Sequence, residues 1–319
     1  MKQPDFWKHQ SFFSIPLAPF AAIYSLIYRL RCITTREYRA NIPVICLGNV
    51  TIGGAGKTPS AIEIGKLLIN MGKKPVFLSR GYGGNIKEAI KVNLEKHTST
   101  ETGDEPLLLA RIAPTIISRN RTDGAKTAEK SADVIIMDDG LQNPSIHKDL
   151  SILVIDGTYG IGNGHIIPSG PLRETLSGAI KRCAAIIFIG DDKTNLLPKL
   201  KKANVLHAKI TPHCEKPSSG KNFIAFAGIA NTEKFFNSLK EHGYNLLDKI
   251  SFSDHYQYNE NDLAKLRKMA NEQGATLITT EKDLVRLNNE QRKNIETLPI
   301  KLEWNDESQI KQLLEGLVQ

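Results

Sequence analysis

The stretch GNVTIGGAGKTPS, residues 48–60, decides the fold. An apolar run at 43–48 leads into it, and a run with helical patterning at 58–71 follows it. Glycines allow backbone N–H groups to surround phosphate oxygens, while Lys57 can reach the β- and γ-phosphates and Thr58 can ligate Mg²⁺. Because the strict motif has Gly where this chain has Thr51, we interpret the stretch as a variant Walker A motif. The residues expected to bind the nucleotide in this loop are Thr51, Ile52, Gly53, Gly54, Ala55, Gly56, Lys57 and Thr58.

A phosphate-binding loop predicts a second, acidic site at the end of another strand. The run VIIMDDG at 134–140 supplies it, since four apolar residues lead to Asp138 and Asp139. A carboxylate at this place can hold Mg²⁺ directly or through water. Together the loop and the carboxylates predict an NTP-dependent enzyme.

The loop alone does not choose among a kinase, a switch ATPase and a GTPase. The sequence has no Asn-Lys-x-Asp motif for reading guanine, which counts against a GTPase. The xGGxGKT form is typical of deviant Walker ATPases, but these have a lysine before the double glycine, where this chain has Ile52. A switch ATPase acting with a protein partner therefore stays as the alternative to a kinase.

Short apolar runs alternate with helical stretches from residue 43 onward, which predicts an α/β fold with a mainly parallel sheet buried on both faces. The polar segment at 211–221 is interpreted as a linker to a smaller α/β domain. We expect an N-terminal helical segment at 1–40, a P-loop domain at 41–216 and a C-terminal domain at 217–319. The expected strands of the P-loop domain are 43–48, 75–79, 114–118, 133–138, 151–156, 184–190 and 204–210, with helices at 58–71, 104–112 and 121–131. In the C-terminal domain we expect strands at 223–228, 247–252 and 275–280 and helices at 231–242, 259–273 and 306–318.

The composition excludes several classes of protein. The chain has 319 residues, of which 40% are hydrophobic and 24% charged, so it is not a disordered polymer. The cysteines have no metal-ligand spacing and are expected to be reduced thiols, which argues against a zinc finger or a secreted disulfide scaffold. They are Cys32, Cys46, Cys183 and Cys214. The net charge of +8 suits a partner rich in phosphate: a nucleic acid, a nucleotide, an anionic lipid or a phosphorylated substrate.

The N-terminal segment is apolar and then basic. Residues 11–28 carry no charge, and a helix from about Pro19 would place Phe20, Ile23, Tyr24 and Ile27 on one face. Residues 1–40 hold six Lys or Arg against two Asp or Glu, which favours a helix lying in a membrane interface over nucleic-acid binding. A buried core helix and a membrane-spanning helix are the other two possibilities.

Further polar clusters follow predicted strands, at the sheet edge where ligands bind. The run SRGYGG supplies Arg80 and Gly81, SRNR supplies Arg121, and PSGPLRE supplies Arg173. Three arginines on such loops suit an anionic acceptor, although one or two of them can equally be partners in structural ion pairs.

Seven motifs occur in an order that closely resembles the tetraacyldisaccharide 4′-kinase (lipid A 4′-kinase) family. They lie at 48–59, 79–84, 103–106 (GDEP), 138–142 (DDGLQ), 168–174, 252–255 (FSDH) and 279–283 (TTEKD). The resemblance implies transfer of the γ-phosphate of ATP, with Mg²⁺, to the 4′-hydroxyl of a tetraacyldisaccharide 1-phosphate, giving lipid IVA. It further implies a peripheral enzyme at the cytoplasmic face of the bacterial inner membrane, with a lipid disaccharide as substrate. We expect no nucleic acid and no obligate protein partner.

The resemblance also assigns roles to individual residues. It implies that Asp104 is the general base, supported by His255 and Asp254, that Lys57 is catalytic, and that Glu105 lies near the metal. In the same way Thr58, Asp138 and Asp139 match metal-binding positions, and Gln142 a nucleotide-binding one. The substrate-binding candidates are Arg80, Gly81, Arg121 and Arg173. The family usually reads DDGFQH where this chain reads DDGLQN, with Leu141 and Asn143, so the role of that last position is open.

Overall fold

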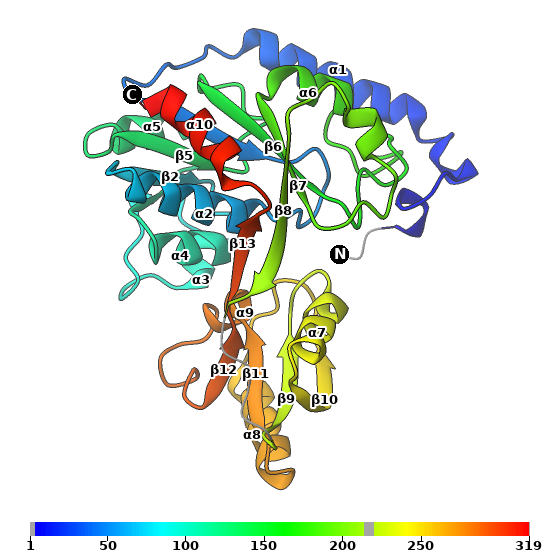
Figure 1. Ribbon diagram of the computed structural model, residues 1–319, viewed down its shortest axis with the longest axis vertical. Coiled ribbons are helices and arrows are strands. Elements are labelled where there is room, and N and C mark those ends of the chain that lie inside the picture. Colours follow the sequence, from blue (N-terminus) through cyan, green and yellow to red (C-terminus); the bar gives the residue numbers. More distant parts are fainter. Residues whose placement is uncertain (1–3, 214–219, 319) are drawn as a thin grey trace.

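The structure, a computed structural model, describes residues 4–213 and 220–318. It divides into a large lobe, built on a nine-stranded sheet, and a small lobe, built on a four-stranded sheet (Figure 1). The part of the linker at 214–219, with Cys214, lies outside the described residues.

The sheet of the large lobe is parallel except at its two edges. Its strands are β1 Val44–Gly48, β2 Pro75–Ser79, β3 Ile90–Lys91, β4 Thr115–Ile117, β5 Val134–Asp138, β6 Leu150–Asp156, β7 Ala185–Ile189, β8 Val205–Pro212 and β13 Ile300–Trp304. Their order is β13-β8-β7-β6-β1-β5-β2-β4-β3, and only β3 and β13 pair antiparallel with their neighbours. The prediction of an α/β fold with a mainly parallel sheet is confirmed, because β1, β2, β5 and β7 are buried along their whole lengths.

Helices cover both faces of this sheet, since alternate residues of each strand point to opposite sides. Ile45 and Leu47 of β1 pack in one hydrophobic cluster, whereas Val44 and Cys46 pack in another. The helices of this lobe are α1 Ala18–Thr34, α2 Lys57–Asn70, α3 Ser99–Thr102, α4 Asp104–Ala110, α5 Arg121–Ala128, α6 Leu176–Arg182 and α10 Glu307–Val318, with short 3₁₀ turns η1 Asp5–Trp7, η2 Phe12–Ser14 and η3 Leu197–Leu200. The first cluster includes residues of α2, α4 and α10, and the second includes residues of α5 and α6.

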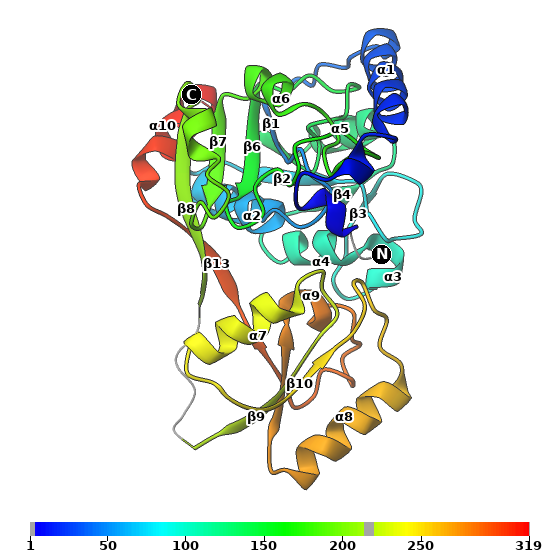
Figure 2. The same cartoon turned by 90° about the vertical axis from the view of Figure 1, so that its right-hand side faces the viewer.

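The small lobe has the same layered construction with fewer strands. Its elements are β9 Asn222–Ala227, α7 Thr232–Glu241, β10 Asn245–Ser251, α8 Glu260–Glu272, β11 Thr276–Thr280, α9 Glu281–Leu284 and β12 Ile295–Leu298. The strands run parallel in the order β10-β9-β11-β12. Phe223 and Phe226 of β9 belong to separate clusters, one with α7 and one with α8, and Figure 2 shows these helices on opposite sides of the sheet.

Two antiparallel strands join the lobes. The chain leaves the large sheet along β8 and returns along β13, whose Trp304 pairs with Ala208 and whose Ile300 pairs with Pro212 (Figure 1). The residues 211 and 212 of the expected linker are therefore strand. β13 and α10, which fall within the expected C-terminal domain 217–319, belong to the large lobe. Ile310 and Leu314 of α10 are buried in the cluster that covers the α2 face of the large sheet.

The helix expected from about Pro19 is α1, which lies across the outer end of the large lobe beside α6 (Figure 1). Ala21 is the one buried residue of this fully described helix, so the alternative of a buried core helix is wrong. Its predicted apolar face is open to solvent, with exposed fractions of 58% for Phe20, 55% for Ile23 and 61% for Ile27. Among the described residues no helix is both long and apolar enough to cross a membrane.

Candidate active site

The Walker A loop connects β1 to α2 and turns at two glycines with positive φ. Gly56 precedes the first residue of α2 with φ 86°, and Gly53 has φ 116°, both in the region that favours glycine. A Cβ at Gly56 would also approach the Ile189 side chain to 2.5 Å. Because α2 begins at Lys57, its free N–H groups and its helix dipole point at the loop, which creates a site for an anion.

Lys57 is held over this loop by polar neighbours. Its Nζ donates to Asn49 Oδ1 at 3.2 Å and lies 3.8 Å from Asp139 Oδ1. Asn49 in turn donates to Thr51 Oγ1 at 3.2 Å and to the Gly53 carbonyl at 3.3 Å, so it braces the loop from inside. Burial lowers the pKa of Lys57, and the charge of Asp139 opposes that effect.

The two carboxylates at the end of β5 have different surroundings. Thr58 Oγ1 donates to Asp138 Oδ2 at 3.2 Å, while Asp138 Oδ1 is buried without a hydrogen-bond partner among the described residues. Burial raises the pKa of Asp138 to about 6, against the lowering effect of Lys57. Asp139 has φ 54° and accepts from Arg173 Nη1 at 3.0 and 3.2 Å. Burial would raise the pKa of Asp139, but the charges of Lys57 and Arg173 bring it below its usual range. Asp138 thus keeps one oxygen without a partner among the described residues, whereas Asp139 is paired with Arg173.

The proline-containing loop 168–174 packs directly on the Walker A loop. Ile52 N donates to the Pro171 carbonyl at 2.9 Å, and Arg173 N donates to the Val50 carbonyl at 2.7 Å. This backbone pairing explains how Arg173 reaches Asp139. Arg173 therefore lies beside the Walker A loop.

A chain of hydrogen bonds runs from this loop to α1. Gln142 Nε2 donates to the Asn49 carbonyl at 2.8 Å and to Glu174 Oε1 at 2.9 Å. Arg182 donates to Glu174 Oε2 at 2.5 Å and to the Tyr28 hydroxyl at 3.3 Å. Gln142 thus supports the Walker A backbone, and the same network connects that backbone to the N-terminal helix.

A pair of acidic residues opens α4 on the side of the large lobe that faces the small lobe. Asp104 and Glu105 form its first turn, and Gly103 precedes them with φ 87° and ψ 165°, a conformation almost restricted to glycine. A Cβ at Gly103 would collide with the carbonyl oxygen of Tyr82. Gly103 therefore lets the Tyr82 loop pack against the backbone that carries Asp104.

Asp104 is 3% exposed and binds two cationic side chains of the small lobe. Oδ2 accepts from His255 Nδ1 at 2.8 Å and from Arg286 Nε and Nη2 at 3.0 and 2.7 Å. Burial would raise the pKa of Asp104, but the hydrogen bonds from His255 and Arg286 bring it below its usual range. The hydrogen bond to Asp104 in turn raises the pKa of His255, against the effect of burial. Each partner therefore stabilises the charged form of the other.

Other side chains complete this interlobe site. Lys282, at the start of α9, donates to Glu105 Oε1 at 2.6 Å, whereas Glu105 Oε2 is buried without a partner in the described part of the chain. His255 has φ 57°, its Nε2 lies 3.9 Å from Asp254 Oδ1, and its ring meets the Tyr82 ring edge-on at 5.9 Å. Asp254 is thus the more distant of the two carboxylates at His255.

A cavity of about 250 Å³ opens beside these residues. Asp104 and His255 line it together with Tyr82, Ser99 and Gln257. A larger cavity of about 510 Å³ lies in the small lobe between α8 and β12, but none of the predicted site residues lines it. The smaller cavity is the candidate for the active site, because Asp104 of the large lobe and His255 of the small lobe both line it.

The predicted site residues fall into two neighbouring groups. The first surrounds the Walker A loop and contains Lys57, Thr58, Asp138, Asp139, Gln142 and Arg173. The second, at the lobe interface, contains Asp104, Glu105, Asp254 and His255. Arg80 is exposed, Gly81 is buried next to Thr102, and Arg121 is buried with Nη1 on the Ser118 carbonyl at 2.8 Å and Nε unpartnered among the described residues. The charges of Arg80 and Asp138 affect the pKa of Arg121, which burial lowers to about 10.

Three residues of the site were not predicted from the sequence, and the role of a fourth was left open. Asn49 and Lys282 lie inside two of the seven motifs, 48–59 and 279–283. Arg286 lies three residues beyond TTEKD, and no sequence pattern indicates a role for it. Asn143, the departure from DDGFQH, accepts hydrogen bonds from Ser145 N and Oγ at 2.8 and 2.7 Å. Its side chain therefore stabilises a local turn.

Comparisons with known proteins agree on one family. The family model for tetraacyldisaccharide-1-P 4′-kinase (LpxK) matches residues 13–319. A tetraacyldisaccharide 4′-kinase from Paramagnetospirillum magneticum is 44% identical over 99% of both chains. One from Rhodospirillum rubrum is 41% identical over 100% of this chain and 98% of its own. A crystal structure of "apo" form LpxK from Aquifex aeolicus in complex with ATP has a TM-score of 0.81 at 26% identity, covering 97% of this chain and all of that one.

We expect Gly103→Ala to reduce activity far more than its loss of stability alone explains. A Cβ at this position strains the backbone by roughly 1–3 kcal/mol and displaces the Tyr82 loop or Asp104. The matched control is Gly72→Ala, since Gly72 also has a positive φ, of 77°, but a Cβ there meets nothing within 4 Å. Thermal unfolding and turnover of both variants provide the comparison. Equal turnover in the two variants at equal loss of stability would contradict a special role for Gly103.

Proposed function

The chain belongs to the tetraacyldisaccharide-1-phosphate 4′-kinase family, and from that premise we propose how its own residues carry out the reaction. The activity is ATP-dependent phosphorylation of a tetraacyldisaccharide 1-phosphate at the 4′-hydroxyl, a step of lipid A biosynthesis. The family match does not favour the alternative of a switch ATPase. The observation that carries the mechanism is the buried Asp104 carboxylate, which belongs to one lobe and is bound by His255 of the other.

The Walker A loop and α2 hold the phosphates of ATP in this proposal. Lys57, released from Asn49 and Asp139, neutralises the β- and γ-phosphates, and Arg173 adds a second positive charge beside Asp139. Phosphoryl transfer depends mainly on positioning and on neutralising charge, so these contacts are the main contribution of the loop.

The oxygens at the end of β5 and at the start of α4 suit Mg²⁺. Asp138 Oδ1 and Glu105 Oε2 are both buried acceptors without a partner among the described residues, and Thr58 adds a hydroxyl next to Asp138. The charges of Asp139 and Glu105 add to the effect of burial in raising the pKa of Asp138. Hard oxygen donors of this kind are what Mg²⁺ prefers, and the ion supplies neutralisation of phosphate charge. We propose Thr58, Asp138 and Glu105 as its ligands and assign Asp139 to orienting Lys57 and Arg173.

Asp104 is the proposed base for the acceptor hydroxyl. All three donors that reach it among the described residues bind Oδ2, which leaves Oδ1 for the substrate. Its pKa lies below the usual range, so the group stays ionised and accepts a hydrogen bond from the hydroxyl. In a loose transition state the proton moves late, and a weak base is sufficient. Since Asp104 and His255 line the 250 Å³ cavity, we propose this cavity as the place of the 4′-hydroxyl.

The remaining arginines suit the anionic end of the acceptor. Arg80 is exposed at the end of β2, and the buried Arg121 has one unpartnered N–H in the described part of the chain. We propose that they bind phosphate oxygens of the lipid, with Gly81 permitting the close turn at its φ of 69°.

Replacing Asp104 with Asn should separate catalysis from nucleotide binding. Loss of the base is expected to lower the rate of label transfer from γ-labelled ATP to the lipid by roughly 10²–10⁴-fold. The affinity for ATP should change less than about threefold, whereas Lys57→Ala should weaken both. Asp262→Asn, which alters the carboxylate that accepts from Asn259 N in the capping box of α8 in the small lobe, is the control. Phosphate release without labelled lipid in the wild type, or equal loss of ATP binding in Asp104→Asn, would contradict the proposal.

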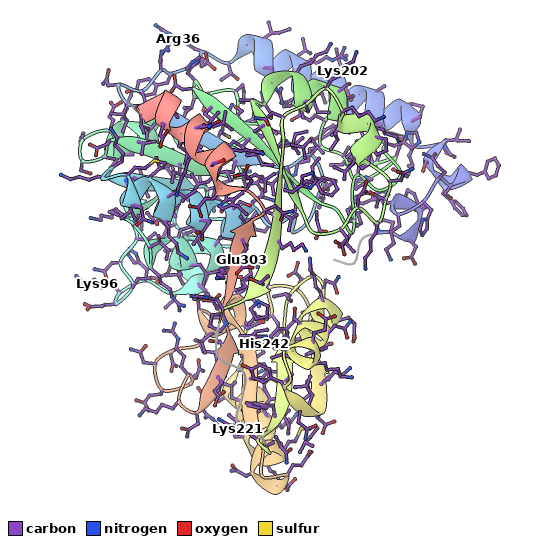
Figure 3. The ribbon with its side chains drawn as sticks, in the orientation of Figure 1. Arg36, Lys96, Lys202, Lys221, His242 and Glu303 are labelled. Carbon is purple, nitrogen blue, oxygen red and sulfur yellow. The ribbon has the colours of Figure 1, made fainter. Side chains whose placement is uncertain are left out.

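We further propose that the protein lies on the membrane surface through α1 and the preceding turn, at the cytoplasmic face of the inner membrane. The exposed apolar side chains there include Phe12 at 88%, Phe13 at 73% and Ile33 at 81%, in addition to the face of Phe20, Ile23 and Ile27. Such a concentration of exposed apolar surface is unusual outside interaction sites. Figure 3 places Arg36 and Lys202 at the same end of the molecule as α1, away from the small lobe. Cations at this end suit anionic headgroups.

The triple variant Phe20→Ser/Ile23→Ser/Ile27→Ser should bind vesicles with anionic lipid more weakly by roughly tenfold or more. Each apolar side chain removed from the interface loses about 1.5–3 kcal/mol at most, and 1.4 kcal/mol is a factor of ten. Ile69→Ser, at an exposed isoleucine of α2, is the matched control. Cosedimentation measures binding, and turnover in detergent micelles checks that the fold is intact. Unchanged cosedimentation of the triple variant with the vesicles would contradict the proposal that α1 binds the membrane.

A further inference from the structure

Arg286 brings a buried guanidinium to the lobe interface. Its side chain is 0% exposed, and it lies in the turn that follows α9 in the small lobe. Nε and Nη2 donate to Asp104 Oδ2, while Nη1 donates to Asp283 Oδ1 at 2.7 Å and to the Gly228 carbonyl at 2.8 Å. One guanidinium therefore joins the proposed base of the large lobe to the framework of the small lobe.

The small-lobe side of this contact is rigidly built. Asp283 is 0% exposed and accepts from the Tyr258 hydroxyl at 2.8 Å, from Gly228 N at 3.0 Å and from Thr280 Oγ1 at 2.6 Å. With its acceptor capacity used in this way, Asp283 holds Nη1 of Arg286 in one position. The Nε–Nη2 edge is then aimed at the large lobe, because a guanidinium is planar and its donors have a fixed fork geometry.

Resting on the function proposed above, we propose that Arg286 is a positioning residue for phosphoryl transfer. Its two N–H groups fix Asp104 Oδ2 next to His255 and so orient Oδ1 toward the acceptor hydroxyl. Arg286 touches neither substrate nor nucleotide in this proposal and acts through Asp104 alone. The small lobe thereby determines the geometry of a base that belongs to the large lobe.

Lysine cannot replace this arrangement. A lysine has one amine, whereas Arg286 serves Asp104 on one edge and Asp283 with Gly228 on the other. Arg286→Lys therefore keeps a positive charge in the buried site, which favours folding, but loses the fork that orients Asp104. Uncompensated buried charge makes Arg286→Ala a poorer test, because that variant risks loss of the fold.

The experiment is a double-mutant comparison of Arg286→Lys, Asp104→Asn and the combined variant, using label transfer from γ-labelled ATP to the lipid in micelles. Arg286→Lys should lower kcat by about 10–100-fold, with KM for ATP and for lipid within about threefold of the wild type. In the Asp104→Asn background the same change should lower kcat less than about threefold, because Arg286 acts through the carboxylate that is already absent.

Arg292→Lys is the matched control. Arg292 donates to the carbonyls of Leu284 and Val285 at 3.1 and 3.5 Å, so these hydrogen bonds support the same segment and stay within the small lobe. It should keep the kcat of the wild type, and thermal unfolding shows whether all variants are folded.

The results distinguish the positioning role of Arg286 from the role of Asp104 as the base. A kcat of Arg286→Lys within threefold of the wild type, or equal losses in both backgrounds, would overturn the positioning role while leaving Asp104 as the base. Turnover like that of the wild type in Asp104→Asn would instead overturn the proposed function of Asp104, and with it the inference about Arg286.

Discussion

The burial of a negative charge on Asp104 is the constraint on which the rest of the site depends. A buried carboxylate is costly unless it is paired and hydrogen-bonded. The partners that offset this cost, His255 and Arg286, both belong to the small lobe. A second contact of the same kind, Lys282 with Glu105, lies one residue away. Cationic groups of one lobe therefore complete an acidic site of the other, and the catalytic geometry that we propose exists where the lobes meet.

Much of the large lobe was predictable because its strands and its Walker A loop are identified by residues that follow one another in the sequence. The apolar runs at 75–79 and 133–138 became β2 and β5 within one residue, since a strand buried on both faces needs continuous apolar sequence. The Walker A loop was predictable for a similar reason, because glycine, Lys57 and Thr58 follow one another in the chain. At the lobe interface the resemblance to a known family, and not the pattern of residues, indicated Asp104 and His255.

The rest could not be predicted because it depends on contacts between distant segments. The strand β13 looks like an ordinary C-terminal strand, and only its pairing with β8 returns the chain to the large lobe. Arg286 contacts a residue 182 positions away, and nothing in its own neighbourhood distinguishes it from a surface arginine. Gln142 and Arg173, which were predicted at the nucleotide and at the substrate, donate to the Asn49 carbonyl and to Asp139, and no sequence pattern indicated these contacts with the Walker A loop and its carboxylate.

The most direct test of this account is the pKa of the His255 imidazole, measured by NMR in the full-length protein and in Asp104→Asn. Bound to Asp104, His255 should titrate above its ordinary value of 6.5, and Asp104→Asn should return it toward that value. Because the pKa is raised in the folded state, the stabilisation from this pair is fully present below about pH 6.5, the unfolded value, and is lost as the pH rises through the folded pKa. A His255 pKa of 6.5 or lower in the wild type, unchanged in Asp104→Asn, would contradict the claim that the lobes meet at this buried charge.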